Sequence, residues 1–139
     1  MKSVMTFRLQ SQLSRIGGLA QRLRVISDAC GCPDETADAL EAAVVEAVTN
    51  VIKHAYGRHS DQHLKVTVQT RGRKLTVDVF DNGPAWKPDL VAHLAGDSDA
   101  ETSRTAGLPM IGASADRAIY QRRMGVNRLR LISYLDRGC

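Results

Sequence analysis

The chain has 139 residues, with 19 Lys and Arg against 15 Asp and Glu, a formal net charge of +4. Hydrophobic residues make up 43% and charged residues 24%, and no apolar run approaches the roughly 18 residues of a membrane-spanning helix. Disordered, fibrous and membrane classes are excluded, and we expect one globular domain over residues 1–139, located in the cytoplasm. Its three cysteines should be reduced thiols, because their spacing fits no zinc site.

The first quarter of the chain predicts a strand followed by a helix. Residues 4–10 alternate weakly between apolar and polar side chains, as a half-buried strand does. Apolar residues then recur at three- and four-residue steps, which indicates an amphipathic helix. Ser11 or Ser14 would cap the start of this helix, and Gly31 would end it.

A second, longer helix carries the most informative stretch of the sequence. We expect Asp34 as its N-cap and a break near Gly57. At about 100° per residue, Glu46, Asn50 and His54 form a polar stripe on an otherwise mostly apolar helix. Burial of a carboxylate or an amide costs free energy unless it has a partner. The stripe therefore faces solvent, other polar groups, a ligand or a metal ion.

The second half of the chain predicts two β-hairpins, over residues 64–80 and 118–135. Between them lie a loop rich in Gly, Pro, Asp and Ser at 81–106 and a short helix at 107–116. This order of elements predicts an α+β fold, a two-layer sandwich with helices on one face of a mixed, mostly antiparallel sheet.

Positive charge is concentrated near the end of the sequence. Residues 117–137 hold six arginines and one acid, Asp136. A nucleic-acid site would fit the charge, but the stretch has two aromatic residues and no recognition motif. A solvated strand face, or a surface for an acidic protein partner, fits the alternating pattern better.

Three motifs and a hairpin occur in a fixed order. They are E-A-V-T-N with H-A-Y-G at 46–57, D-N-G-P-A-W-K-P at 81–88, G-L-P-M at 107–110 and R-x-x-G-x-N-x-L-x-L at 122–131. The series resembles the GHKL ATPase superfamily and, within it, the anti-sigma factor serine/threonine kinases. The resemblance implies the Bergerat, or histidine kinase-like ATPase, fold. It assigns an N-box at about 41–57, a first glycine box at 81–88, a lid at about 89–106 and a second glycine box at 107–110.

The resemblance implies roles for the residues of the helical stripe. Asn50 would be the Mg²⁺ ligand, since a neutral oxygen suits an ion that the phosphates and waters also coordinate. Glu46 would be the general base, or alternatively would only organise water around the metal. His54 would lie near the phosphates or simply end the stripe.

The glycine boxes and the lid would complete the ATP site. Asp81 would accept the adenine amino group, and Gly83 would leave room for the base to approach the backbone. Thr105, Gly107 and Leu108 would contact the phosphates. Trp86 would cover the nucleotide or belong to the core. Pro109 departs from the family pattern, which has glycine there, and removes one backbone N–H from the phosphate site.

The implied function is an ATP- and Mg²⁺-dependent serine/threonine protein kinase. It would sequester a sigma factor and phosphorylate a STAS-type anti-sigma factor antagonist, without binding nucleic acid or membrane directly. The alternative is an ATP-binding partner-switch module with weak or no kinase activity, because of Pro109. The catalytic domain of a two-component histidine kinase fits less well. Gly17 and Gly18 weaken the first helix and suggest close packing there, and the resemblance implies a homodimer through this region.

Overall fold

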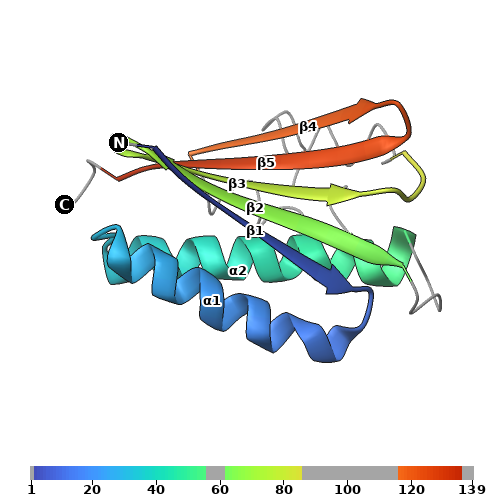
Figure 1. Ribbon diagram of the computed structural model, residues 1–139, viewed down its shortest axis with the longest axis horizontal. Helices are drawn as coiled ribbons and strands as arrows, with labels where there is room; N and C mark the ends of the chain where they lie inside the picture. Colours follow the sequence, from blue (N-terminus) through green and yellow to red (C-terminus); the bar gives the residue numbers. More distant parts are fainter. Residues whose placement is uncertain (1, 56–61, 86–115, 136–139) are drawn as a thin grey trace, which may run out of the picture.

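The computed structural model describes residues 2–55, 62–85 and 116–135, which form a five-stranded sheet with two helices on one face (Figure 1). The strands are β1 (Lys2–Gln10), β2 (His63–Arg71), β3 (Lys74–Asp81), β4 (Arg117–Arg123) and β5 (Val126–Tyr134). The helices are α1 (Ile16–Ala29) and α2 (Asp34–Asn50), with a 3₁₀ turn η1 (Leu13–Arg15) before α1 and a π-helix η2 (Val51–Ala55) after α2. The α+β sandwich that the sequence predicts is confirmed.

The sheet order is β1-β2-β3-β5-β4, and all four neighbouring pairs are antiparallel. The sequence predicts a mixed sheet, whereas the described strands contain no parallel pair. Hairpins make β2–β3 and β4–β5 antiparallel. Two antiparallel helices separate β1 from β2 and return the chain to the end where β1 finished (Figure 1), so this pair is antiparallel as well.

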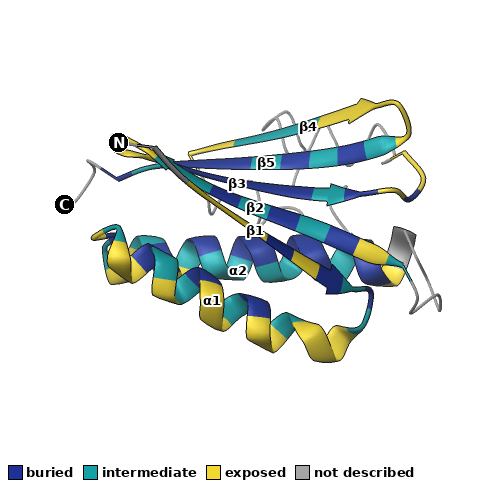
Figure 2. Ribbon diagram, in the orientation of Figure 1, coloured by how far each residue is buried: buried dark blue, intermediate teal, exposed yellow. Residues whose placement is uncertain are grey.

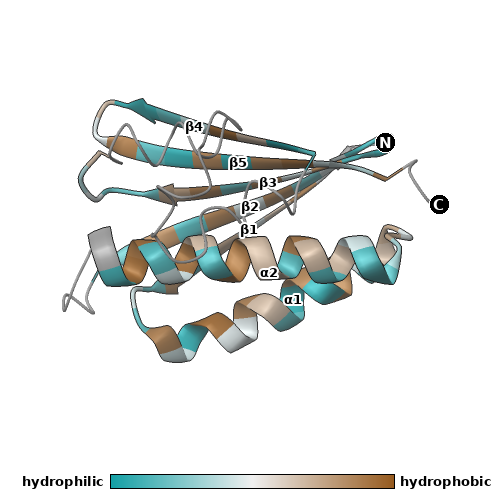
Figure 3. Ribbon diagram, turned by 180° about the vertical axis from the view of Figure 1, so that it is seen from behind, coloured by the Kyte–Doolittle hydropathy of each residue, from teal (hydrophilic) through white to brown (hydrophobic). Residues whose placement is uncertain are grey.

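The core lies between the sheet and the helices. Hydrophobic and hydrophilic residues alternate along the strands, as Figure 3 shows from behind, and the buried ones concentrate in β2, β3 and β5 (Figure 2). Fully buried residues of the strands include Leu64, Val66, Leu75, Val77, Leu129 and Leu131, and those of the helices include Leu23, Leu40, Val44 and Val48. None of the helices in the described segments is long and apolar enough to cross a membrane.

Both helices begin differently from the sequence prediction. Neither Ser11 nor Ser14 caps α1, which follows directly from η1 without a side-chain cap. Ser11 is instead buried, and its backbone N–H donates to the carbonyl of Gln62 at 2.8 Å. Asp34 is the first residue of α2 rather than its cap, because Pro33 occupies that position.

The corner between the helices has the predicted glycine terminator. Gly31 has φ +74°, and its N–H donates to the carbonyl of Asp28 at 3.1 Å. Cys32 N–H donates to the carbonyl of Ser27 at 3.0 Å, which completes a Schellman motif. Cys30 and Cys32 form no disulfide within the described part of the chain, and partial burial raises the pKa of the Cys30 thiol.

One arginine links the two helices at their outer surface. Arg24 of α1 forms ion pairs with Asp28 at 3.4 Å, Asp34 at 3.1 Å and Glu41 at 3.8 Å, and with Asp38 through a short hydrogen bond. The hydrogen bond to Asp38 and the surrounding carboxylates raise the pKa of Arg24. The acids of this surface therefore already share a cation.

Both predicted hairpins are present and close with positive φ angles. Gly72 in the β2–β3 turn has φ +60°. The β4–β5 turn is formed by Met124 at φ +53° and Gly125 at φ +80°. Two consecutive positive φ angles are the signature of a type I′ turn, which matches the twist of the strands.

Candidate functional site

The polar stripe predicted on the second helix lies on α2. Glu46 and Asn50 are one turn apart, and both are half-buried. Ala43, Ala47 and Val48 of the same helix are fully buried. The stripe therefore borders the core without entering it, and it is neither fully solvated nor fully enclosed.

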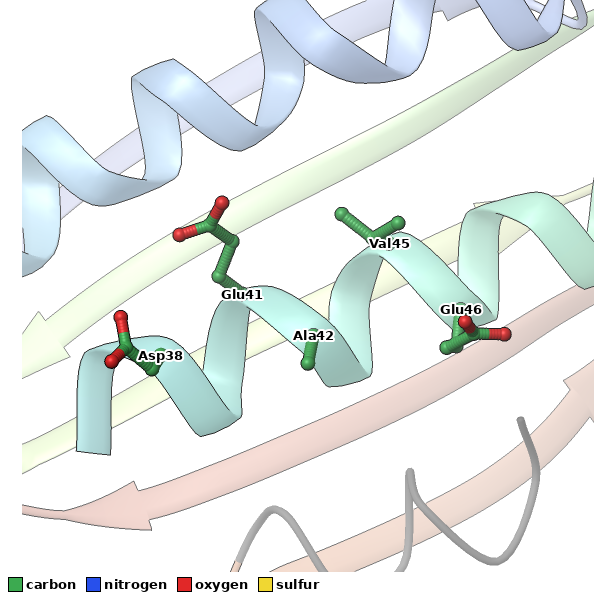
Figure 4. Close-up of a pocket in the computed structure, with 5 residues that line it drawn as sticks. All are labelled: Asp38, Glu41, Ala42, Val45 and Glu46. Atoms are coloured by element: carbon green, nitrogen blue, oxygen red, sulfur yellow. The ribbon is translucent and has the colours of Figure 1, made fainter. Parts of the chain in front are cut away.

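Glu46 also borders a shallow depression of about 380 Å³ along α2, drawn in Figure 4. The depression is lined by Asp38, Glu41, Ala42, Val45 and Glu46. In Figure 4, Glu41 and Val45 project toward the α1 side of the helix, and Glu46 lies on the opposite edge. Three carboxylates make this depression unfavourable for phosphate groups, so it is not where a nucleotide would place them.

Asn50 carries a buried polar atom that lacks a partner within the described part of the chain. Its Nδ2 is inaccessible to solvent and makes no hydrogen bond there. A buried amide left unpaired costs about 1–3 kcal/mol, so this position favours a further polar group. A half turn of the amide exchanges its nitrogen for its oxygen, and a neutral oxygen is a suitable ligand for Mg²⁺. The residue type and its environment fit the metal that the motif implies.

The helix changes character immediately after Asn50. Residues Val51–Ala55 form the π-helix η2, which contains His54. A π-helix has i→i+5 hydrogen bonds and more residues per turn, so the α-helical spacing that aligns His54 with Glu46 and Asn50 does not continue through it. The His54 side chain lies outside the described residues, and its predicted role stays a prediction.

Asp81 ends β3 on the side of the sheet that faces the helices. Its side chain is buried, with 3% of the residue exposed. Oδ1 accepts hydrogen bonds from Gly83 N at 2.8 Å and from Asn127 Nδ2 at 2.9 Å. The carboxylate is thus held in one orientation, and its own turn brings the buried Gly83 beside it.

Asn127 of β5 fixes the turn that follows Asp81. Besides Asp81, its Nδ2 donates to the carbonyl of Gly83 at 3.2 Å and of Pro84 at 2.8 Å. Its Oδ1 accepts from Arg122 Nη1 at 3.0 Å and from the hydroxyl of Tyr120. Arg122 Nη1 also donates to the carbonyl of Gly83 at 2.8 Å.

Sequence reasoning assigned no role to Tyr120, Arg122 and Asn127. The signal for two of them was present, since Arg122 and Asn127 are the fixed polar positions of the hairpin motif. The turn places these two residues directly opposite each other, on the helix-facing side of the sheet. The motif does not show that they bind the Asp81 turn, because β5 lies beside β3 only in the folded sheet.

The two halves of the candidate site lie at one end of the molecule. Helix α2 packs against β3 and β5. Figure 1 shows the carboxyl ends of α2 and β3 at the same end. Asn50 and Asp81 therefore belong to one region between the helices and the sheet, although they are 31 positions apart in the sequence. Thr105, Gly107, Leu108, Trp86 and Pro109 lie outside the described residues, as does nearly all of the predicted helix at 107–116.

Comparisons with known proteins agree with the motifs. A family model described as a histidine kinase-like ATPase domain matches residues 9–133. The chain is similar to the Serine-protein kinase RsbW of Listeria innocua serovar 6a and to that of Listeria monocytogenes serotype 4a, each at 34% identity over 88 residues. Each alignment covers 60% of this chain and 55% of the relative, so the chain spans about half the length of the curated relatives it matches.

A solved structure shares the fold. The crystal structure of the RsbU and RsbW domains of a Mycobacterium tuberculosis protein matches with a TM-score of 0.70 at 18% sequence identity. The match covers 96% of this chain and 32% of that chain. The fold and the resemblance drawn from the motifs are both confirmed.

Proposed function

Because this chain belongs to the histidine kinase-like ATPase domain family, we propose that it is an ATP-binding anti-sigma regulatory factor with serine/threonine protein kinase activity. The observation that carries the proposal is the location of the Glu46–Asn50 stripe and the Asp81 turn at the same end of the molecule. The relatives named serine-protein kinases support the kinase activity. Such a regulator would act in the cytoplasm, where transcription takes place.

In the proposed reaction, Glu46 is the general base. Its carboxylate would accept the proton of a serine or threonine hydroxyl of the substrate protein as that oxygen attacks the γ-phosphate. Asn50, one turn further along α2, would hold Mg²⁺ through its side-chain oxygen. The ion neutralises charge on the phosphates when it is bound. If Glu46 only organised water, its removal would change metal affinity rather than the transfer step.

The Asp81 turn would recognise the adenine. The orientation that Gly83 N–H and Asn127 impose on the carboxylate suits an acceptor of the adenine amino group. An acceptor that is already fixed in the free protein loses less conformational entropy when the ligand binds. His54, Thr105, Gly107 and Leu108 complete the proposed nucleotide site on the phosphate side.

The proposed partners are a sigma factor, an anti-sigma factor antagonist of STAS type and a second copy of the chain. Gly17 and Gly18 are exposed, and a Cβ added to either meets no atom within 4 Å of the described structure. No described segment of the same chain fills this space, so the close packing expected at Gly17 and Gly18 stays a prediction, and a partner is left to supply it. We assign this surface of α1, together with the edge strand β1, to the homodimer.

Two substitutions on α2 test the proposal. Asn50→Ala should weaken Mg-ATP binding by at least about tenfold, since a metal ligand is lost. Glu46→Gln should bind ATP within about twofold of wild type but lower phosphotransfer by about 100-fold or more. The measurements are calorimetric titration with Mg-ATP and transfer of labelled phosphate to a purified antagonist. Glu35→Gln, at an exposed position in the first turn of α2, is the matched control.

Equal Mg-ATP affinity in wild type and Asn50→Ala would refute the nucleotide site. Undiminished transfer by Glu46→Gln would remove that residue from the mechanism. A second candidate function, the partner-switch module without kinase activity, is favoured by Pro109, which supplies no N–H to the phosphates. If the protein is such a module, the wild type should bind ATP but should transfer no labelled phosphate to the antagonist.

A further inference from the structure

The face of the sheet that is turned away from the helices is strongly basic. Every second residue of each strand belongs to this face, which we call the outer sheet face. Its central row crosses all five strands and contains Arg8, Lys65, Phe80, Arg128 and Gln121, each directly opposite the next. Asp78, in the neighbouring row, is the one acidic residue of this face among the described strands.

The single acid is already engaged. Asp78 binds Arg130 of β5 through two hydrogen bonds, of 2.8 Å and 2.9 Å. The hydrogen bond to Asp78 raises the pKa of Arg130, and Asp78 is only 6% exposed. Because this bidentate pair uses Asp78, the outer face of the described strands has no further carboxylate to neutralise the central row.

Like charges directly oppose each other on two strand pairs of this face. Arg8 lies opposite Lys65, and Arg71 opposite Lys74. Like charges in directly opposite positions of an antiparallel pair are destabilising. The outer sheet face therefore keeps an arrangement that is unfavourable for the isolated chain and favourable for contact with an anionic surface.

The central row is also partly fixed in place. Lys65 Nζ lies 4.5 Å from the centre of the Phe80 ring, a cation–π contact. Arg128 Nη2 donates to Gln121 Oε1 at 2.6 Å, while its buried Nε has no hydrogen-bond partner among the described residues. Lys65 and Arg128 are thus held by their neighbours. Arg128 Nε is still without a hydrogen-bond partner among the described residues.

We infer that the outer sheet face docks an acidic segment of a partner protein. Charge complementarity identifies the occupant, since a row of cations on a sheet face matches a row of carboxylates. This surface lies on the opposite side of the sheet from Asp81 and Asn127, so it does not depend on the proposed nucleotide site.

Two other anionic occupants fit the described residues less well. Single-stranded nucleic acid binds to sheets through aromatic rings that stack on bases, and Lys65 covers Phe80 in the central row. A second copy of the chain would offer the acids on its helices. Four of those already surround Arg24 in the folded chain, namely Asp28, Asp34, Asp38 and Glu41.

The test uses a fluorescent peptide of glutamate residues as the probe, with binding followed by anisotropy at low and physiological salt. The double variant Arg8→Glu with Lys65→Glu should bind at least about tenfold more weakly than wild type. It keeps like charges opposite each other, so its fold is not put under new strain. The control, Lys53→Glu with Arg73→Glu, changes the net charge equally at exposed positions after α2 and in the β2–β3 turn, and should stay within about twofold.

A single substitution separates lost binding from lost folding. Arg8→Glu places a carboxylate opposite Lys65, so the thermal midpoint should rise by about 1–3 °C while peptide binding falls. An equal loss of binding in the sheet variant and the control variant would overturn the inference. So would tighter, equally variant-sensitive binding of DNA of the same charge, or self-association that persists in Gly18→Gln and is abolished by the sheet variant alone.

Discussion

At the scale of single residues, the side-chain amide of Asn127 connects the second hairpin to the turn that follows β3. Its nitrogen donates to three oxygens of the Asp81 turn, and its oxygen accepts from Tyr120 and Arg122. The residue is 1% exposed, so water does not replace any of these bonds. The orientation of Asp81 therefore depends on a residue from the last strand.

Replacing Asn127 with Leu, which has a similar shape, should destabilise the fold by about 1–3 kcal/mol, because buried acceptors lose their donor. It should also weaken ATP binding. Urea unfolding and calorimetric titration measure the two effects. The control Arg123→Ala, at an exposed position on the same hairpin, should cost less than about 0.5 kcal/mol. Equal stability of the two variants would contradict the role given to Asn127.

The sequence motifs predict Asn50 and Asp81 as site residues, whereas no motif predicts the contacts of Asn127. The first two lie in short motifs whose spacing is local, on one helix turn and directly after one strand. The partner of Asn127 lies 46 positions away, and the contact exists only because β5 lies beside β3. A single sequence contains no local pattern that reports such a distant pairing.

At the scale of elements, turns were predicted better than helix starts. Gly31 and Gly125 end or join elements at positive φ angles, which glycine adopts without steric cost, so the sequence reveals them directly. The cap predicted at Ser11 is wrong because tertiary structure competes for the same residue, whose N–H pairs with Gln62. The π-helix after Asn50 has no compositional signal. The sequence prediction therefore continues the α-helical spacing through His54, where the structure does not.

Met124 is the least favourable residue of the second hairpin turn. It has φ +53° and is 97% exposed, so it has the steric cost of a left-handed conformation without compensating burial. Met124→Asn should stabilise the protein by about 0.5–1 kcal/mol, since Asn-Gly is preferred in type I′ turns. Differential scanning calorimetry should show a higher thermal midpoint. Gly125→Ala, at the adjacent position with φ +80°, should lower it, and a decrease for both would refute the turn assignment.

At the scale of the whole molecule, the layered architecture and the two antiparallel hairpins follow from patterns visible in the sequence, whereas the relative direction of β3 and β5 does not. Hydrophobic alternation predicts that strands bury one face, and the order of elements predicts helices on that face. Whether β3 and β5 run antiparallel depends on the path of the chain between them, which includes residues 86–115. Of the predicted mixed, mostly antiparallel sheet, the antiparallel part is confirmed, and no parallel pair occurs among the described strands.

The proposed homodimer belongs to the scale of the whole molecule, and one substitution tests it. Gly18→Gln adds a polar side chain where a Cβ meets nothing within 4 Å, so the protomer should keep its stability. It should shift the sedimentation of a wild-type dimer to that of a monomer. Ala29→Gln, exposed at the far end of α1, is the control and should remain dimeric. A monomeric wild type at all concentrations would refute the assignment of this surface.

The position of β5 inside the sheet has a consequence for synthesis on the ribosome. The chain leaves the exit tunnel from its amino end, and β1, both helices, β2 and β3 emerge before the donors of the Asp81 turn. The edge strand β4 emerges before β5 but has no neighbour until β5 arrives between it and β3. The turn proposed to recognise adenine is thus held in place only after β5 has emerged, so a nascent chain cannot hold nucleotide in the proposed manner before then.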